Sequence, residues 1–200
     1  MILPVRRLSS EYQPGLVEAS RSALLELSLA LGSFKDSFVL IGGWAPYFLI
    51  EEYGKRKFSH VGSIDIDLAI DPETIDEDSY SGIIERIEDR GYLQRKDRFG
   101  EPLYFSFHKP VKSNIDGRNY DIQVDFLTSR DFSRGKHRHR TIQRNLRARV
   151  CEECEIAFEH NFKKKIMGKL PDNGEAESYI QVINIPGSIG MSSIYPEVSE

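Results

Sequence analysis

Two segments of the chain alternate between apolar and polar residues, and they constrain the fold more than any other feature. In residues 63–70, SIDIDLAI, branched apolar residues alternate with one serine and two aspartates. Residues 119–129, NYDIQVDFLTS, repeat the alternation, with Asp121, Gln123 and Asp125 on the polar side. Successive side chains of a β-strand point to opposite faces of a sheet. Each segment therefore predicts a strand with one buried face and one polar face.

The rest of the pattern predicts helices and strands in one α+β domain. With 200 residues, 40% of them hydrophobic, the chain is long enough to bury a sizeable core, and its two cysteines exclude a disulfide framework. We expect a core over about residues 14–130. A basic segment and a small C-terminal α/β extension follow over about 131–200, in a truncated or minimal form. The expected elements are helices over 14–31, 43–54 and 76–91, strands over 37–41, 92–99 and 102–110, a strand or hairpin piece over 156–170, a loop over 170–178 and a strand over 179–187.

Two adjacent glycines stand where the strand over 37–41 is expected to become a helix. Gly42 and Gly43 lie within VLIGGWAPYFL, just ahead of the only tryptophan. Residues without side chains would let a phosphate approach the backbone N–H groups at the positive end of the helix. The alternative is that the glycines only turn the chain. Trp44 fits a packing residue at the helix start better than a base-stacking platform.

The aspartates of the two alternating strands form a candidate metal site. Asp65 and Asp67 project from one face of a strand, about 6–7 Å apart at their backbones. Asp125 on the other strand could bring a third carboxylate beside them, and Asp121 is the alternative. If the aspartates have no function, they simply form a solvated strand face. Carboxylates gathered in one cleft repel each other unless cations neutralise them. Mg²⁺, or Mn²⁺, suits oxygen ligands completed by substrate phosphates, and two such ions assist in-line displacement at phosphorus.

The ordered combination of LIGGWAPYFL, SIDIDLAID and DIQVDFL resembles nucleotidyltransferases of the DNA polymerase beta superfamily over about residues 38–127. The similarity is closest to the AbiEii-type abortive-infection toxins and more distant to aminoglycoside nucleotidyltransferases. It implies the nucleotidyltransferase fold, a mixed β-sheet flanked by helices with metal-binding aspartates on adjacent strands. The resemblance further implies that a nucleoside triphosphate is held by Gly42, Gly43 and Ser63, that metal is held by Asp65, Asp67 and Asp125, and that Asp125 also serves as the base.

This resemblance implies transfer of a nucleoside monophosphate from a Mg²⁺-bound nucleoside triphosphate such as ATP to a hydroxyl acceptor, with release of pyrophosphate. The acceptor could be RNA, protein or a small molecule. The toxin-like relatives imply a toxin component held by an antitoxin protein. The alternative is a catalytically inactive module that binds RNA or a partner protein through its basic segment.

The second half of the chain offers two weaker hypotheses. Basic residues gather between Arg134 and Arg149, where they could grip the phosphates of an RNA or tRNA acceptor or simply solvate a surface. Cys151 and Cys154, with His137 and His139 upstream, supply four residues of the types that bind zinc. Their spacing matches no common zinc motif, so an incidental cysteine pair is the alternative.

Charge and hydropathy exclude little else. The formal net charge of −4 is ordinary for an intracellular protein and indicates no particular partner. The N-terminal segment lacks the long apolar core of a secretion signal, and no run of apolar residues reaches the length of a membrane span. We therefore expect a cytoplasmic protein that does not enter membranes.

Overall fold

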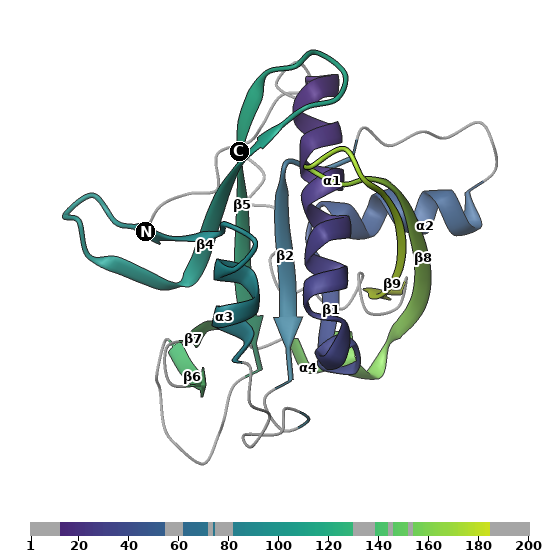
Figure 1. Cartoon of the computed structure of the whole chain (residues 1–200). Helices are drawn as coiled ribbons and strands as arrows, with labels where there is room; N and C mark the ends of the chain where they lie inside the picture. The colour runs from purple at the N-terminus through teal and green to yellow at the C-terminus, as the bar shows by residue number, and fades with distance from the viewer. Residues whose placement is uncertain are drawn as a thin grey trace, which may run out of the picture.

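The computed structural model is an α+β fold in which a mixed, open β-sheet is flanked by helices (Figure 1). It describes residues 13–54, 62–71, 74, 82–129, 139–143, 146–151 and 154–184. The helices are α1 (Pro14–Ala30), the 3₁₀ helix η2 (Gly32–Ser37), α2 (Trp44–Tyr53), α3 (Ile83–Glu88) and α4 (Cys154–Glu159). The strands are β1 (Phe38–Ile41), β2 (Asp65–Ile70), β3 (Leu93–Lys96), β4 (Pro102–Lys112), β5 (Asn119–Thr128), β6 (His139–Gln143), β7 (Leu146–Val150), β8 (Asn161–Lys169) and β9 (Glu175–Ile183).

The sheet is centred on β5, β2 and β1, and its strands run in both directions. Over the described residues the order is β3-β4-β5-β2-β1-β9-β8, with β7 paired to the far end of β5 and β6 paired to β7. Strand β2 is antiparallel to β1 and parallel to β5, and β4 is antiparallel to β5. All four residues of β1 are buried, as expected for a strand covered on both faces.

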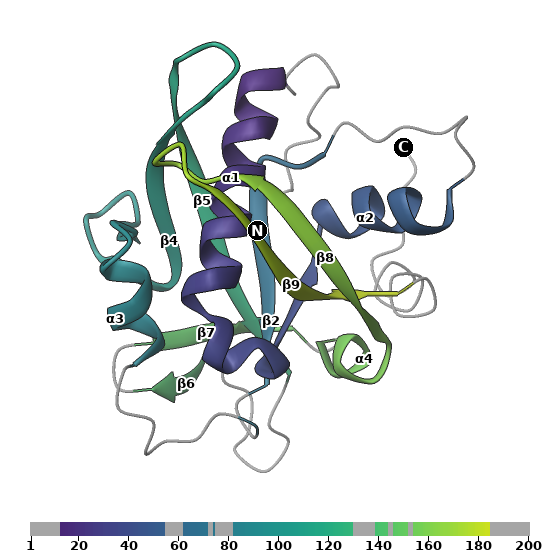
Figure 2. The ribbon, with the colours of Figure 1, turned by 45° about the vertical axis from the view of Figure 1, so that its right-hand side comes forward.

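Helix α1 lies along one face of the sheet, where it contacts β2, β4, β5, β8 and β9 (Figures 1 and 2). Leu68 of β2 points toward this helix, because it lines a small cavity with Leu24, Leu27 and Leu31. Helix α4 packs against β1, β5 and β9. Since neighbouring residues of a strand point to opposite faces, the aspartate before Leu68 lies on the face away from α1.

Most of the expected elements are confirmed. The strand alternation holds, since Ile66, Leu68, Ile122, Val124 and Phe126 are all buried. The residues at the outer ends of the two patterns, Ile64 and Tyr120, are only partly buried. Of the charged helix expected over 76–91, only the part from residue 82 onward falls in the described residues, where α3 spans Ile83–Glu88.

Two expectations for the C-terminal half are wrong. Residues 154–159 form α4 rather than part of a strand, because Cys154 and Ala157 share a buried helical face that periodicity over so short a segment does not reveal. The expected loop over 170–178 is shorter, since β9 already begins at Glu175. The turn is closed by Leu170 and Gly174, whose backbone groups hydrogen-bond at 2.7 Å. Pairing with β8 overrides the polar composition of this segment.

A buried ion pair ties α1 to β4. Lys109 Nζ donates to both carboxylate oxygens of Glu26, at 2.8 and 2.7 Å, and their side chains are only 15% and 8% exposed. The ammonium also lies 5.2 Å from the ring centre of Tyr92. Burial, followed by the negative charge of Glu26, raises the pKa of the Tyr92 phenol well above its usual range. The phenol is therefore neutral, and it donates to the carbonyl of Ala23 at 3.2 Å.

We predict that Lys109→Met destabilises the fold by about 3 kcal/mol, because it leaves the Glu26 carboxylate buried without its partner. The double variant Lys109→Met with Glu26→Gln should recover most of this loss, since no buried charge remains. Urea unfolding of the single and double variants measures both effects. Equal stability of the two variants would contradict the assignment of the loss to the unpaired charge.

Candidate functional site

The sequence-predicted aspartates lie on adjacent strands of the sheet. In the parallel pairing of β2 with β5, Asp67 is the register partner of Asp125, and Asp65 is the partner of Gln123. Paired residues of neighbouring strands project from the same face, about 4.8 Å apart at the backbone. The three carboxylates therefore share the face of the sheet that points away from α1. Asp65, Asp67 and Asp125 are each partly buried.

The glycine turn meets this face at Asp67. Ile41, the last residue of β1, is the register partner of Asp67, so Gly42 follows directly beside that aspartate. Gly42 has a φ of +64°, and a Cβ added to it would collide with the Asp67 carboxylate. A Cβ added to Gly43 would lie 2.5 Å from Ser63 Oγ. Both glycines are thus in close contact with candidate site residues.

Helix α2 begins at this turn. Gly43 is its N-cap, and the Ala45 N–H donates to the carbonyl of Gly42 at 3.1 Å. Pro46 has no N–H, so the other N–H groups at this end of the helix belong to Gly43 and Trp44. Trp44 itself is 1% exposed and donates through Nε1 to Ser20 Oγ at 3.1 Å. The prediction that Trp44 is a packing residue is confirmed.

Asp125 is held by two side-chain hydrogen bonds that the sequence analysis missed. Ser106 Oγ donates to Asp125 Oδ1 at 2.5 Å, and Gln123 Nε2 donates to Oδ2 at 2.9 Å. Arg95 in turn lies 3.4 Å from Ser106 Oγ through one guanidinium nitrogen. Gln123 was visible on the polar side of the alternation. Ser106 was not, because only the register of β4 against β5 places it opposite Asp125.

Asp121, the alternative to Asp125, is positioned differently. It lies four residues earlier on β5, where its register partner is Pro110, and its side chain is 63% exposed. His108 Nδ1 lies 2.7 Å from its carboxylate oxygen Oδ1. Asp121 therefore shares the face of the candidate site but is engaged with a histidine, whereas Asp125 lies directly beside Asp67.

The side chains of the candidate site are of the types that bind an oxygen-preferring cation, but they are not gathered around one metal position. Three carboxylates and the hydroxyl of Ser63 are the ligand types that Mg²⁺ and Mn²⁺ prefer. The described part of the chain nevertheless contains no group of three or more His, Cys, Asp or Glu side chains arranged around one point for a metal ion. The three carboxylates of the predicted metal centre thus share one face of the sheet, and the described residues form no three-ligand cluster there.

The two hypotheses for the second half of the chain concern residues that lie mostly outside the described side chains. Most of the basic segment between Arg134 and Arg149 lies outside the described side chains, although the Arg149 guanidinium lies 6.0 Å from the ring centre of Phe105. Cys151 and Cys154 are buried and form no disulfide. No metal-binding group forms around them within the described residues, and His137 lies outside those residues.

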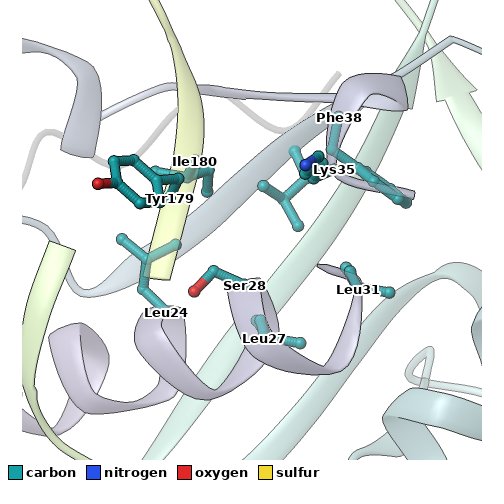
Figure 3. A pocket seen from close by; sticks show the side chains of 9 residues that line it. Leu24, Leu27, Ser28, Leu31, Lys35, Phe38, Tyr179 and Ile180 are labelled. Atoms are coloured by element: carbon teal, nitrogen blue, oxygen red, sulfur yellow. The ribbon is translucent and has the colours of Figure 1, made fainter. Parts of the chain in front are cut away.

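Two hollows in the described part of the chain lie away from the candidate site. An apolar cavity of about 20 Å³ between α1, η2 and β9 has room for about one water molecule (Figure 3). Leu24, Leu27 and Ile180 line it on the α1 side of the sheet. A second hollow of about 240 Å³ lies against α1 and β8, near Arg21. Neither hollow includes a sequence-predicted site residue.

We predict that Gly42→Ala destabilises the protein more than Gly100→Ala does. Both glycines have positive φ, +64° and +86°, but a Cβ at Gly100 meets nothing within 4 Å. Gly100→Ala should therefore cost only the backbone strain, about 1–2 kcal/mol. Gly42→Ala must in addition displace the Asp67 carboxylate. Thermal unfolding of the two variants measures the difference, and equal losses would contradict a close contact between Gly42 and Asp67.

Comparisons with known proteins do not assign the chain to a family. No family model, no curated protein and no solved structure matches the chain. Within the described residues, no helix is long and apolar enough to cross a membrane. The functional argument consequently depends on the motifs and on the geometry of the site.

Proposed function

We propose that the chain is a nucleotidyltransferase with the nucleotidyltransferase fold. In this proposal it moves a nucleoside monophosphate from a nucleoside triphosphate to a hydroxyl acceptor and releases pyrophosphate. The observation that carries the proposal is the pairing of Asp67 with Asp125 on parallel strands, next to a glycine turn that touches Asp67. These features bring the three motifs of the sequence resemblance together where β1 ends beside Asp67 of β2 and Asp125 of β5.

In the proposed site, each residue has a separate role. Asp65, Asp67 and Asp125 would hold Mg²⁺ or Mn²⁺, which would stabilise the negative charge on the pentacoordinate phosphorus and on the leaving pyrophosphate. The triphosphate would approach the N–H groups of Gly43 and Trp44 at the start of α2. The absence of side chains on the two glycines lets Asp67 and Ser63 lie against this turn.

The reaction is a single displacement at phosphorus. The acceptor hydroxyl oxygen forms a bond to the α-phosphorus, while the bond from the α-phosphorus to the oxygen of the β-phosphate breaks. The electron pair of that bond leaves with pyrophosphate. Asp125 accepts the proton that the hydroxyl loses. Because Asp67 and Asp125 are register partners, both carboxylates would lie close enough to share one cation beside the α-phosphate.

The proposal leaves room for several acceptors, namely RNA, protein or a small molecule. The resemblance to abortive-infection toxins favours a toxin component that an antitoxin protein restrains. Growth arrest on expression, relieved by co-expression of a small neighbouring gene, would support that version. The chemistry at the aspartates is the same in each case, so the acceptor does not affect the tests below.

One observation favours a second candidate function. The described residues do not gather three ligands around one metal position. This arrangement fits a module that keeps the fold, lacks catalysis and binds RNA or a partner protein through the segment between Arg134 and Arg149. Such a module would bind no nucleoside triphosphate in a metal-dependent way, which calorimetry with Mg²⁺ and each triphosphate measures directly.

We predict that Asp67→Asn abolishes transfer of label from α-³²P-labelled nucleoside triphosphates to pools of RNA, protein and small molecules. The change removes a negative charge while keeping the shape of the side chain. Asp121→Asn is the matched control, because Asp121 lies on the same sheet face but is paired with His108. It should retain transfer at nearly the wild-type rate.

Unfolding temperatures within about 2 °C of wild type would show that both variants remain folded. Transfer by folded Asp67→Asn at the wild-type rate would refute the assignment of the site. Loss of transfer in both Asp67→Asn and Asp121→Asn would instead favour Asp121 over Asp125 as the third carboxylate.

A further inference from the structure

We propose that Ser106 and Gln123 are positioning residues that hold the Asp125 carboxylate in one orientation for metal binding and proton transfer. The inference rests on the proposed function and adds residues to its site. Ser106 lies on β4 directly opposite Asp125, and Gln123 precedes Asp125 by two residues on β5. All three side chains therefore leave the sheet on the same face.

The two hydrogen bonds restrain Asp125 from both sides. Ser106 Oγ contacts Oδ1 at 2.5 Å, and Gln123 Nε2 contacts Oδ2 at 2.9 Å. With one donor on each oxygen, rotation of the carboxylate about its terminal torsion breaks both bonds at once. Terminal carboxylate torsions are otherwise broad, so a fixed plane needs donors of this kind.

The direction of the Ser106 hydrogen bond is set by its surroundings. Ser106 is 1% exposed, and an Arg95 guanidinium nitrogen lies 3.4 Å from its hydroxyl oxygen. Arginine can only donate, so the Ser106 oxygen accepts from Arg95 and uses its one proton toward Asp125. Water has little access to replace this hydroxyl. The contact is therefore a built feature of the sheet rather than an incidental surface contact.

The two hydrogen bonds leave acceptor positions on Asp125 for metal binding and for proton transfer. An ionised carboxylate offers about four acceptor positions on its two oxygens. Ser106 and Gln123 occupy one position on each oxygen. One remaining position can face a cation shared with Asp67, and another can receive the proton of the acceptor hydroxyl. Positioning of this type typically changes metal affinity or activity by about 10–100-fold when it is lost.

The test uses the full chain and four variants. Ser106→Ala and Gln123→Met each remove one donor to Asp125, whereas Ser106→Thr keeps the hydroxyl and suits a β-strand. His108→Gln is the matched control, because His108 lies two residues further along β4 on the same face and contacts Asp121 instead. The measurements are the Mn²⁺ dissociation constant from electron paramagnetic resonance, the orientation of Asp125 in crystal structures, and kcat and KM for nucleotide transfer.

We expect Ser106→Ala and Gln123→Met to weaken Mn²⁺ binding by about tenfold or more and to lower kcat with little change in KM for the triphosphate. Their crystal structures should show a rotated or doubled Asp125 carboxylate. Ser106→Thr and His108→Gln should match the wild type in all three measurements. A purely structural role would lower the unfolding temperature without this pattern.

The outcomes separate the inference from the proposed function. Wild-type Mn²⁺ affinity and an unchanged Asp125 orientation in both donor variants would overturn the positioning role, even if the chain transfers nucleotides. A wild-type chain that binds Mn²⁺ but transfers no nucleotide would refute the proposed function, while weaker Mn²⁺ binding in the donor variants would still support positioning. A wild-type chain that binds no Mn²⁺ would overturn both.

Discussion

The parallel pairing of β2 with β5 is the constraint on which the candidate site depends. A shift of this register by one residue would turn Asp67 or Asp125 toward the apolar face, because side chains alternate along both strands. The opposite face fixes the register. Phe126 packs against Phe38 and Phe107 there, with ring centres 6.0 and 5.8 Å apart. The buried Thr128 hydroxyl, which donates to the carbonyl of Ile70 at 2.9 Å, closes the far end of the pair. Aromatic packing on one face thus sets the positions of the carboxylates on the other.

Strand β4 contributes side chains to contacts on both faces of the sheet. Lys109 points toward α1, where it pairs with the buried Glu26, and Ser106 points the opposite way, where it binds Asp125. Removal of the ion pair would therefore loosen the strand that orients Asp125, as well as the attachment of α1. Buried ion pairs contribute little net stability but strongly disfavour arrangements that separate their charges. The pair between α1 and β4 is consequently better understood as fixing the position of β4 than as a source of folding energy.

Sequence patterns predicted the elements that bury residues periodically and missed those that depend on partners. The alternation around Asp65 and Asp125 gave both strands and the side of each that faces the core, because a period of two is unambiguous over eight or more residues. The helix around Ala157 was missed because its six residues are too few to show a helical period. The early start of β9 at Glu175 was missed because it depends on pairing with β8, which composition does not show. The same reason hid Ser106. Its relation to Asp125 exists only through the register of β4 against β5, which local composition does not encode.

The second glycine is the strongest argument that the turn does more than reverse the chain. Gly42 has a φ of +64°, so a turn alone would explain it. Gly43 has a φ of −64° and a ψ of −23°, a conformation that any residue adopts at the start of a helix. The backbone therefore does not require glycine there. The requirement comes from Ser63, whose hydroxyl would be 2.5 Å from any Cβ at this position. Two glycines in sequence thus let the chain after β1 pass in close contact with both Asp67 and Ser63.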